Sequence, residues 1–110
     1  MRVGIMRNGT IKILMNWDIK PGLDQEYFEF VMREWVPNTT KLGLTPIEAW
    51  YNVYATSDIP KIMAGAIAED ESKMREIITS DDWADLQEKL MEYVENYSHK
   101  IVRVTGDYQL

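Results

Sequence analysis

Amide, indole and phenol side chains are the groups in this sequence best suited to chemistry on a small molecule. They occur as Asn16 in one apolar segment and as Trp50, Asn52 and Tyr54 at alternate positions of another. An amide can hydrogen-bond a carbonyl or phenolate oxygen, and an indole can pack against a planar ring. These four residues are therefore candidates for a ligand pocket, which we expect between helices and sheet. The alternative is structural, with Trp50 and Tyr54 packing a subunit interface and Asn52 satisfying backbone groups.

His99 and Arg103 complete the candidate pocket with an imidazole and a cation. His99 is the only histidine of the chain, so any imidazole that acts as a base must be this one. Arg103 and Glu48 are charges within otherwise apolar segments, and such charges are rarely left unpaired near a core. We expect them to pair with each other, or between subunits. A surface histidine and a structural ion pair are the alternatives to functional roles.

Composition argues against metal sites, nucleic acid and membranes. The chain has no cysteine and one histidine, so a zinc site would depend on carboxylates alone. A formal net charge of −6 repels phosphate backbones. Neither a secretory signal nor a stretch long enough to span a bilayer is evident, and the lack of cysteine is compatible with a reducing compartment. We expect a cytoplasmic protein without a metal, a nucleic-acid partner or a membrane anchor.

The first half of the chain predicts strand, helix and strand. Residues 10–17 alternate between a fully apolar face and a mixed one, which predicts a strand. Apolar positions follow helical spacing over residues 23–42, with a kink expected just before Pro37 and a left-handed end at Gly43. Residues 45–55 alternate again and predict a strand that carries three of the candidate pocket residues.

The second half repeats this order. Residues 61–69 predict a strand, and Asp70 caps a short helix that reaches Ile78. A capping box at Thr79 begins a longer helix, whose apolar residues continue at three- and four-residue steps to Tyr97. Residues 100–105 predict the last strand.

This order predicts an α+β fold of the ferredoxin-like type, a four-stranded antiparallel sheet with the helices on one face. We expect one domain over residues 1–110, with residues 1–9 as a leader or as an extra hairpin strand turned at Asn8 and Gly9. The strand at 45–55 has large apolar residues on both faces, so its second face should be covered by something other than water. We therefore predict a homodimer formed through the sheet.

From Thr10 onward the sequence resembles the dimeric α+β barrel superfamily, in which two such sheets face each other and close a barrel between subunits. This superfamily includes antibiotic-biosynthesis-monooxygenase-like proteins and related small domains of unknown function. The likeness is carried by an opening strand, a turn that enters a helix, an aromatic strand and a late helix, which read IKILMNW, DIKPG with EYFEFV, EAWYNVY and SDDWADLQEKL.

The resemblance implies several classes of activity: cofactor-free quinone-forming monooxygenases, haem-degrading monooxygenases, small isomerases and domains without known activity. The cofactor-free monooxygenases are similar in using an asparagine, a tryptophan and a basic residue around a polycyclic phenol, types that Asn16, Trp17, Trp50 and Arg103 supply. The haem-degrading relatives use a histidine from a helix, whereas His99 lies at a strand, so no cofactor is expected. We expect a small dimeric domain that binds an apolar or aromatic molecule. The alternative is a cofactor-independent monooxygenase or isomerase acting on a planar phenolic or keto compound.

Overall fold

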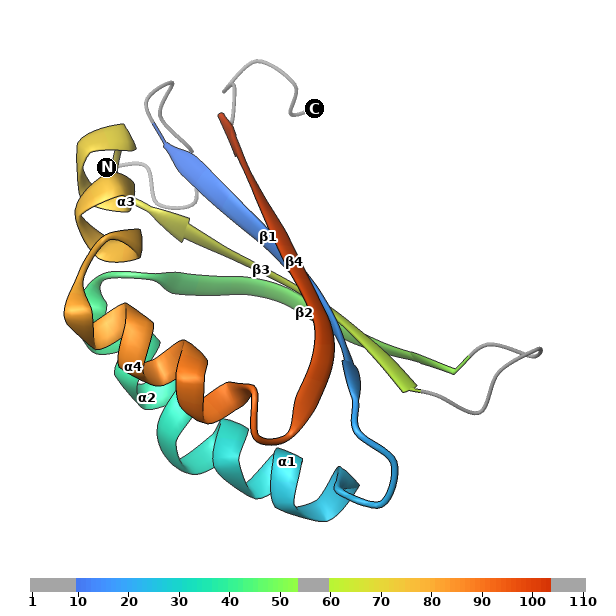
Figure 1. Cartoon of the computed structure of the whole chain (residues 1–110). Coiled ribbons are helices and arrows are strands. Elements are labelled where there is room, and N and C mark those ends of the chain that lie inside the picture. The colour runs from blue at the N-terminus through green and yellow to red at the C-terminus, as the bar shows by residue number, and fades with distance from the viewer. Residues whose placement is uncertain (1–9, 54–59, 104–110) are drawn as a thin grey trace.

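A four-stranded antiparallel sheet with helices packed on one face makes up the computed structural model of this chain, which describes residues 10–53 and 60–103 (Figure 1). The strands are, in chain order, β1 (Ile11–Ile19), β2 (Thr45–Val53), β3 (Pro60–Ala68) and β4 (Val94–Arg103). The helical segments are α1 (Asp24–Phe30), the π-helix η1 (Val31–Trp35), α2 (Val36–Leu42), α3 (Glu71–Ile78) and α4 (Asp81–Leu90). The spatial order β2-β3-β1-β4 confirms the predicted ferredoxin-like fold.

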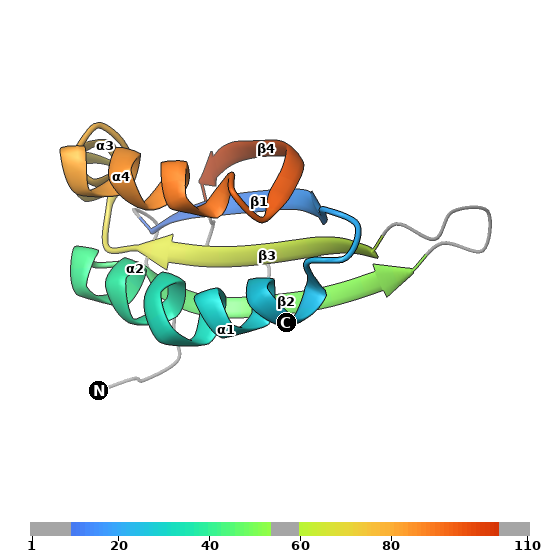
Figure 2. The same cartoon turned by 60° about the horizontal axis from the view of Figure 1, so that its bottom comes forward.

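The core lies between the sheet and the helices and is built on the apolar face of β1. Alternate residues of β1 face this core, and each is at most 5% exposed: Ile11, Ile13, Met15 and Trp17, as predicted, and Ile19 beyond the predicted end of the strand. No helix of the described residues lies over the other face of the sheet (Figure 2). Lys12, Leu14 and Asn16 lie on that open face and are half-buried by their neighbours.

One wide turn carries the first helix past its proline. The backbone N–H of Val36 donates to the carbonyl of Val31, five residues back, so η1 is a π turn. Pro37 has no N–H, and its ring would clash with the carbonyl four residues before it in a regular α-helix. The predicted kink is therefore absorbed by η1, and the helix continues to Leu42. Gly43 ends it at φ +113°, in the left-handed region, as predicted.

The two later helices are capped by side chains. Asp70 accepts a hydrogen bond from the Lys73 N–H at 2.8 Å, which confirms the predicted cap of α3. The cap of α4 is one residue later than predicted, because Ser80 Oγ accepts from the Trp83 N–H at 3.1 Å.

The prediction that the last helix continues to Tyr97 is wrong. Helix α4 ends at Leu90 and β4 already begins at Val94. The apolar spacing was misleading because a strand that follows a short turn satisfies it equally well. Val94 is 1% exposed in the core, Tyr97 stacks on Trp17, and the Lys20 N–H donates to the carbonyl of Tyr93 at 2.9 Å.

Within the described residues, no helix has the length and apolarity needed to cross a membrane. Residues 1–9, for which a leader or an extra strand was expected, lie outside the described part of the chain, as does Tyr54.

Candidate functional site

A small interior cavity of about 110 Å³ lies between the helices and the sheet. Its walls are almost entirely apolar and include two indoles and a phenol. The lining residues are Met15, Trp17, Tyr27, Val31, Trp35, Val36, Thr39, Leu44, Pro46, Ile62, Ala64, Gly65 and Ala66. Trp17 comes from β1, Tyr27 from α1 and Trp35 from η1, so one strand and the first helix supply the aromatic walls.

The polar centre of this cavity is the pair Trp17 and Tyr27. Trp17 Nε1–H donates to the Tyr27 hydroxyl at 3.0 Å, and both residues are at most 2% exposed. Burial raises the pKa of Tyr27 to about 12, against the smaller opposing effect of the hydrogen bond from Trp17. Tyr27 is therefore a neutral phenol at physiological pH, and within the described part of the chain its own O–H has no acceptor. It can donate a hydrogen bond to an oxygen inside the cavity.

The π turn shapes one wall of the cavity and lies beside its mouth. Val31 and Trp35, the first and last residues of η1, both line it. Val36 follows directly and is 37% exposed, and Pro46 at the start of β2 is also exposed. The cavity thus reaches the surface between α2 and β2. π turns inside helices often occur at functional sites because they displace side chains from helical register.

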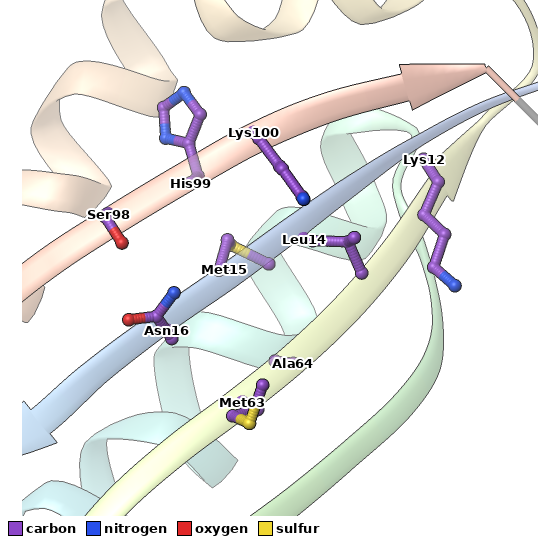
Figure 3. Close-up of a pocket in the computed structure, with 9 residues that line it drawn as sticks. All are labelled: Lys12, Leu14, Met15, Asn16, Met63, Ala64, Ser98, His99 and Lys100. Carbon is purple, nitrogen blue, oxygen red and sulfur yellow. The ribbon is translucent and has the colours of Figure 1, made fainter.

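A second hollow lies on the open face of the sheet. It is a groove of about 570 Å³ across the three strands β3, β1 and β4, lined by Lys12, Leu14, Met15, Asn16, Met63, Ala64, Ser98, His99 and Lys100 (Figure 3). Asn16 pairs directly with Ser98 in the β1–β4 register, and Leu14 pairs with Lys100. Amide and hydroxyl thus lie at one end of the groove, and Lys100 extends from β4 toward Leu14.

Asn16 lies in this groove and not between the helices and the sheet, where it was expected. The reason is the period of two along a strand: Met15 and Trp17 face the core, so Asn16 faces away from it. The register continues the row through Met63 of β3 to Trp50 of β2. Asn52 pairs with Lys61 in the neighbouring row.

An ion pair lies on the open face of the sheet, beyond one end of the groove. The Asp18 carboxylate is 2.8 Å from Lys61 Nζ and accepts a hydrogen bond from Asn96 Nδ2 at 2.8 Å. Burial alone would raise the pKa of Asp18, but the hydrogen bonds from Lys61 and Asn96, with the charge of Lys61, outweigh it and lower that pKa. Asn96 adopts φ +57° beside the irregular pairing between Asn16 and Asp18, which brings its amide to the carboxylate.

His99 borders the groove, but its ring projects to the opposite side of β4 from Lys100 (Figure 3). Its Nδ1 is 2.9 Å from the Tyr97 hydroxyl, and the imidazole is exposed to solvent. Burial raises the pKa of Tyr97 to about 12, with a smaller lowering from its hydrogen bond with Gln87. Tyr97 in turn stacks on Trp17, with ring centroids 5.8 Å apart.

Arg103 does not join either hollow. Its guanidinium donates to Glu71 Oε1 of α3 at 3.1 Å, and both side chains are more than half exposed. Pairing with Glu48, as expected from the sequence, is wrong, because Glu48 is on β2 and two strands separate β2 from β4. Such an exposed ion pair contributes little to stability.

Several residues of both hollows were not singled out by sequence reasoning as pocket residues. Tyr27 and Trp35 read as ordinary core positions of an amphipathic helix, and Lys12 as part of the mixed face of the first strand. Alternation in β1 was the one available signal for Lys12, which precedes Leu14 and Asn16 on the same face. No group of three or more histidine, cysteine or carboxylate side chains that could hold a metal ion occurs among the described residues.

Comparison with known proteins identifies the fold. No family model matches the sequence, and no curated protein matches it. A NIPSNAP family protein from Agrobacterium tumefaciens is similar in structure, with a TM-score of 0.69 and 18% identity over 98% of this chain and 96% of that chain. A NIPSNAP-like domain protein from Burkholderia xenovorans has a TM-score of 0.68 and 13% identity over 94% and 91% of the two chains.

SnoaB, a cofactor-independent oxygenase from Streptomyces nogalater, is also similar, with a TM-score of 0.64 and 11% identity over 87% of this chain and 93% of that chain. These similarities confirm the ferredoxin-like α+β fold that the sequence predicted. At such low identity they show the fold alone.

Proposed function

We propose that this protein is a homodimer, assembled through the open faces of two sheets, and that each protomer binds a small aromatic molecule in its interior cavity. The observation that carries the proposal is the buried Tyr27 hydroxyl, which accepts from Trp17 and has its own proton left to donate among apolar walls. Ligand pockets commonly combine such apolar walls with a few oriented polar groups.

The cavity volume decides the size of the ligand. An apolar cavity of roughly 150 Å³ holds a benzene molecule, and the cavity here measures about 110 Å³ with an opening between α2 and β2. A single ring fits with a small adjustment of the walls, whereas a polycyclic compound requires the helices to move. The proposed ligand is therefore a one-ring compound that carries an oxygen for Tyr27.

The Tyr27→Phe variant tests this role of the phenol. We expect it to bind phenol about fivefold more weakly than the native protein, because one hydrogen bond between neutral groups is lost. Binding of toluene, which has nearly the same shape but no oxygen, should change little. The measurement is a titration followed by the indole N–H resonances of the tryptophans in NMR spectra.

Tyr93→Phe serves as the matched control, since Tyr93 stacks on Phe30 outside the cavity. It should bind both compounds as the native protein does. Equal binding of phenol and toluene by the native protein, or no binding of either at millimolar concentration, would contradict the proposed ligand class.

Apolar side chains on the open face support the proposed dimer. Leu14, Met63, Ile67 and Val102 are half-buried there, on the face that no helix of the described residues covers. They come from the three strands β1, β3 and β4, and Leu14 lies diagonal to the other three, so the four side chains are neighbours on one face. Two sheets can pack face to face at about 10 Å when such side chains interdigitate.

Met63→Glu is expected to convert the dimer to a monomer. Met63 pairs with Asn16 and Trp50 in the register, so a carboxylate here has no cation beside it on the neighbouring strands and would be buried on association at a cost of several kcal/mol. Light scattering after size exclusion should give twice the 12.9 kDa chain mass for the native protein and the single mass for the variant. Met32→Glu, on the helix side where Met32 is 69% exposed, should remain dimeric. A native protein that is monomeric at about 100 µM, well above the Kd of a stable dimer, would overturn the assembly.

The competing function is that of a cofactor-independent monooxygenase or isomerase. Fold similarity to SnoaB favours it, but the described residues that line the cavity include one titratable group, Tyr27, whose raised pKa keeps it from acting as a base. Binding is therefore the function we propose. The absence of cysteine from the sequence supports a cytoplasmic setting for it.

A further inference from the structure

We infer that the groove on the open face is a second binding site, which takes an organic anion with a flat apolar body. This site is distinct from the interior cavity, since the β1 side chains Leu14 and Asn16 that line it lie on the opposite face of the sheet from Trp17. Its volume of about 570 Å³ suits a molecule of two or three rings.

Two lysines give the groove its charge. Lys100 pairs with Leu14 in the register and Lys12 pairs with Val102, so the two lysines occupy diagonal positions on neighbouring strands. Diagonal residues on one face are roughly 7–8 Å apart, within reach of long side chains. The whole chain carries −6, whereas these two lysines place positive charge on neighbouring strands of this face.

Asp18, a buried acid on this face, is already neutralised by Lys61. Asp18 holds Lys61 at 2.8 Å, at the far end of the face from Lys12. Lys100 has no ion-pair partner among the residues that the structure describes. A carboxylate, sulfonate or phenolate in the groove would supply one.

The affinity that we expect at this site depends on the proposed dimer. When two open faces meet, the groove of one protomer faces that of its partner, and the ammonium groups of both lose part of their contact with water. Removing a charge from water is costly unless an opposite charge accompanies it. An anion between the sheets offsets this cost.

The remaining lining residues fit the rest of such a ligand. Leu14 and Met63 provide an apolar floor on which a flat ring can lie. Asn16 and Ser98, paired at the other end, offer amide and hydroxyl groups for a second oxygen. The groove thus distinguishes the two ends of the ligand.

Two fluorescent probes that share one aromatic skeleton test the site. 1-Anilinonaphthalene-8-sulfonate carries a sulfonate, whereas N-phenyl-1-naphthylamine is neutral, and both are too large for the interior cavity. We expect Lys100→Gln to weaken binding of the sulfonate about tenfold, since a charge-assisted contact is lost, and to leave the neutral probe unchanged. Lys41→Gln removes the same charge from exposed α2 and should alter neither affinity.

A second measurement does not depend on any variant. For the native protein, affinity for the sulfonate should fall severalfold between about 50 mM and about 500 mM NaCl, while that of the neutral probe stays constant. Equal affinity for both probes, with neither salt nor Lys100→Gln changing the ratio, would overturn the anion site. Light scattering on the same samples separates the proposals: a monomer that still prefers the sulfonate supports the anion site and overturns the assembly.

Discussion

Trp17→Ala is expected to lower the free energy of unfolding by about 3–5 kcal/mol, the range for removing a large buried aromatic side chain. Trp17 is 1% exposed and holds the aromatic core together. Its ring packs edge-on against Trp35, with ring centroids 5.8 Å apart, and stacks on Tyr97. Its indole N–H donates a hydrogen bond to the Tyr27 hydroxyl. The truncation enlarges the existing cavity of about 110 Å³, so the lost contacts are not replaced.

Urea denaturation followed by far-UV circular dichroism measures this effect. Because a domain of this kind has only about 5–15 kcal/mol of stability, the variant should unfold at a much lower urea concentration. Phe28→Ala is the matched control, since Phe28 is 44% exposed and should lose less than about 1 kcal/mol. A Trp17→Ala loss as small as that of the control would show that Trp17 is not central to the core.

Asp18→Asn is expected to lower the free energy of unfolding by about 2–3 kcal/mol. Breaking a fully buried ion pair from one side costs about 3–5 kcal/mol, and the value is lower here because the Lys61 side chain is 26% exposed. The variant leaves the Lys61 ammonium near the sheet surface without its carboxylate. Asp85→Asn, an exposed change of the same kind on α4, should cost less than about 0.5 kcal/mol.

The pH dependence gives this prediction a second readout. The folded pKa of Asp18 is below its ordinary value of 3.8, so the folded state binds its proton less readily than the unfolded state. The stability that the carboxylate contributes is fully present above the unfolded pKa and is lost as the pH falls through 3.8 toward the folded pKa. Native protein should therefore lose more stability than Asp18→Asn between about pH 5 and pH 3.

A double variant separates the charge from the packing. Adding Lys61→Met to Asp18→Asn removes the unpaired ammonium and should recover part of the lost stability, because a hydrophobic replacement of a buried pair is often nearly neutral. If the single and double variants are equally stable, and if their acid profiles match that of the native protein, the ion pair is not the source of the effect.

The alternation of β1 could be predicted from the sequence, and so could the end of the first helix. A strand with Ile11, Ile13 and Met15 on one side can bury only that side, and the buried set is the predicted one. Gly43 ended the helix as expected, because only glycine adopts such a φ without strain. These features depend on neighbours in the chain, so a local pattern is enough to determine them.

The start of β4 could not be predicted from the local sequence. Leu90, Val94 and Tyr97 suit one side of a helix and equally the route from a helix through a turn into a strand. Val94 is buried, and the Lys20 N–H donates a hydrogen bond to the carbonyl of Tyr93. Both interactions favour the strand, and both form only when this segment lies beside β1.

The sequence by itself determined the order of elements, the core face of β1 and the ferredoxin-like plan, because each follows from the spacing of apolar residues along a few turns or pleats. Tertiary structure alone decided the rest of the site. It brought Tyr27 to Trp17, paired Arg103 with Glu71, and placed Lys100 beside Leu14 on the face away from the helices. Such pairings are set by strand register and helix packing between segments far apart in the chain, and no local spacing encodes them.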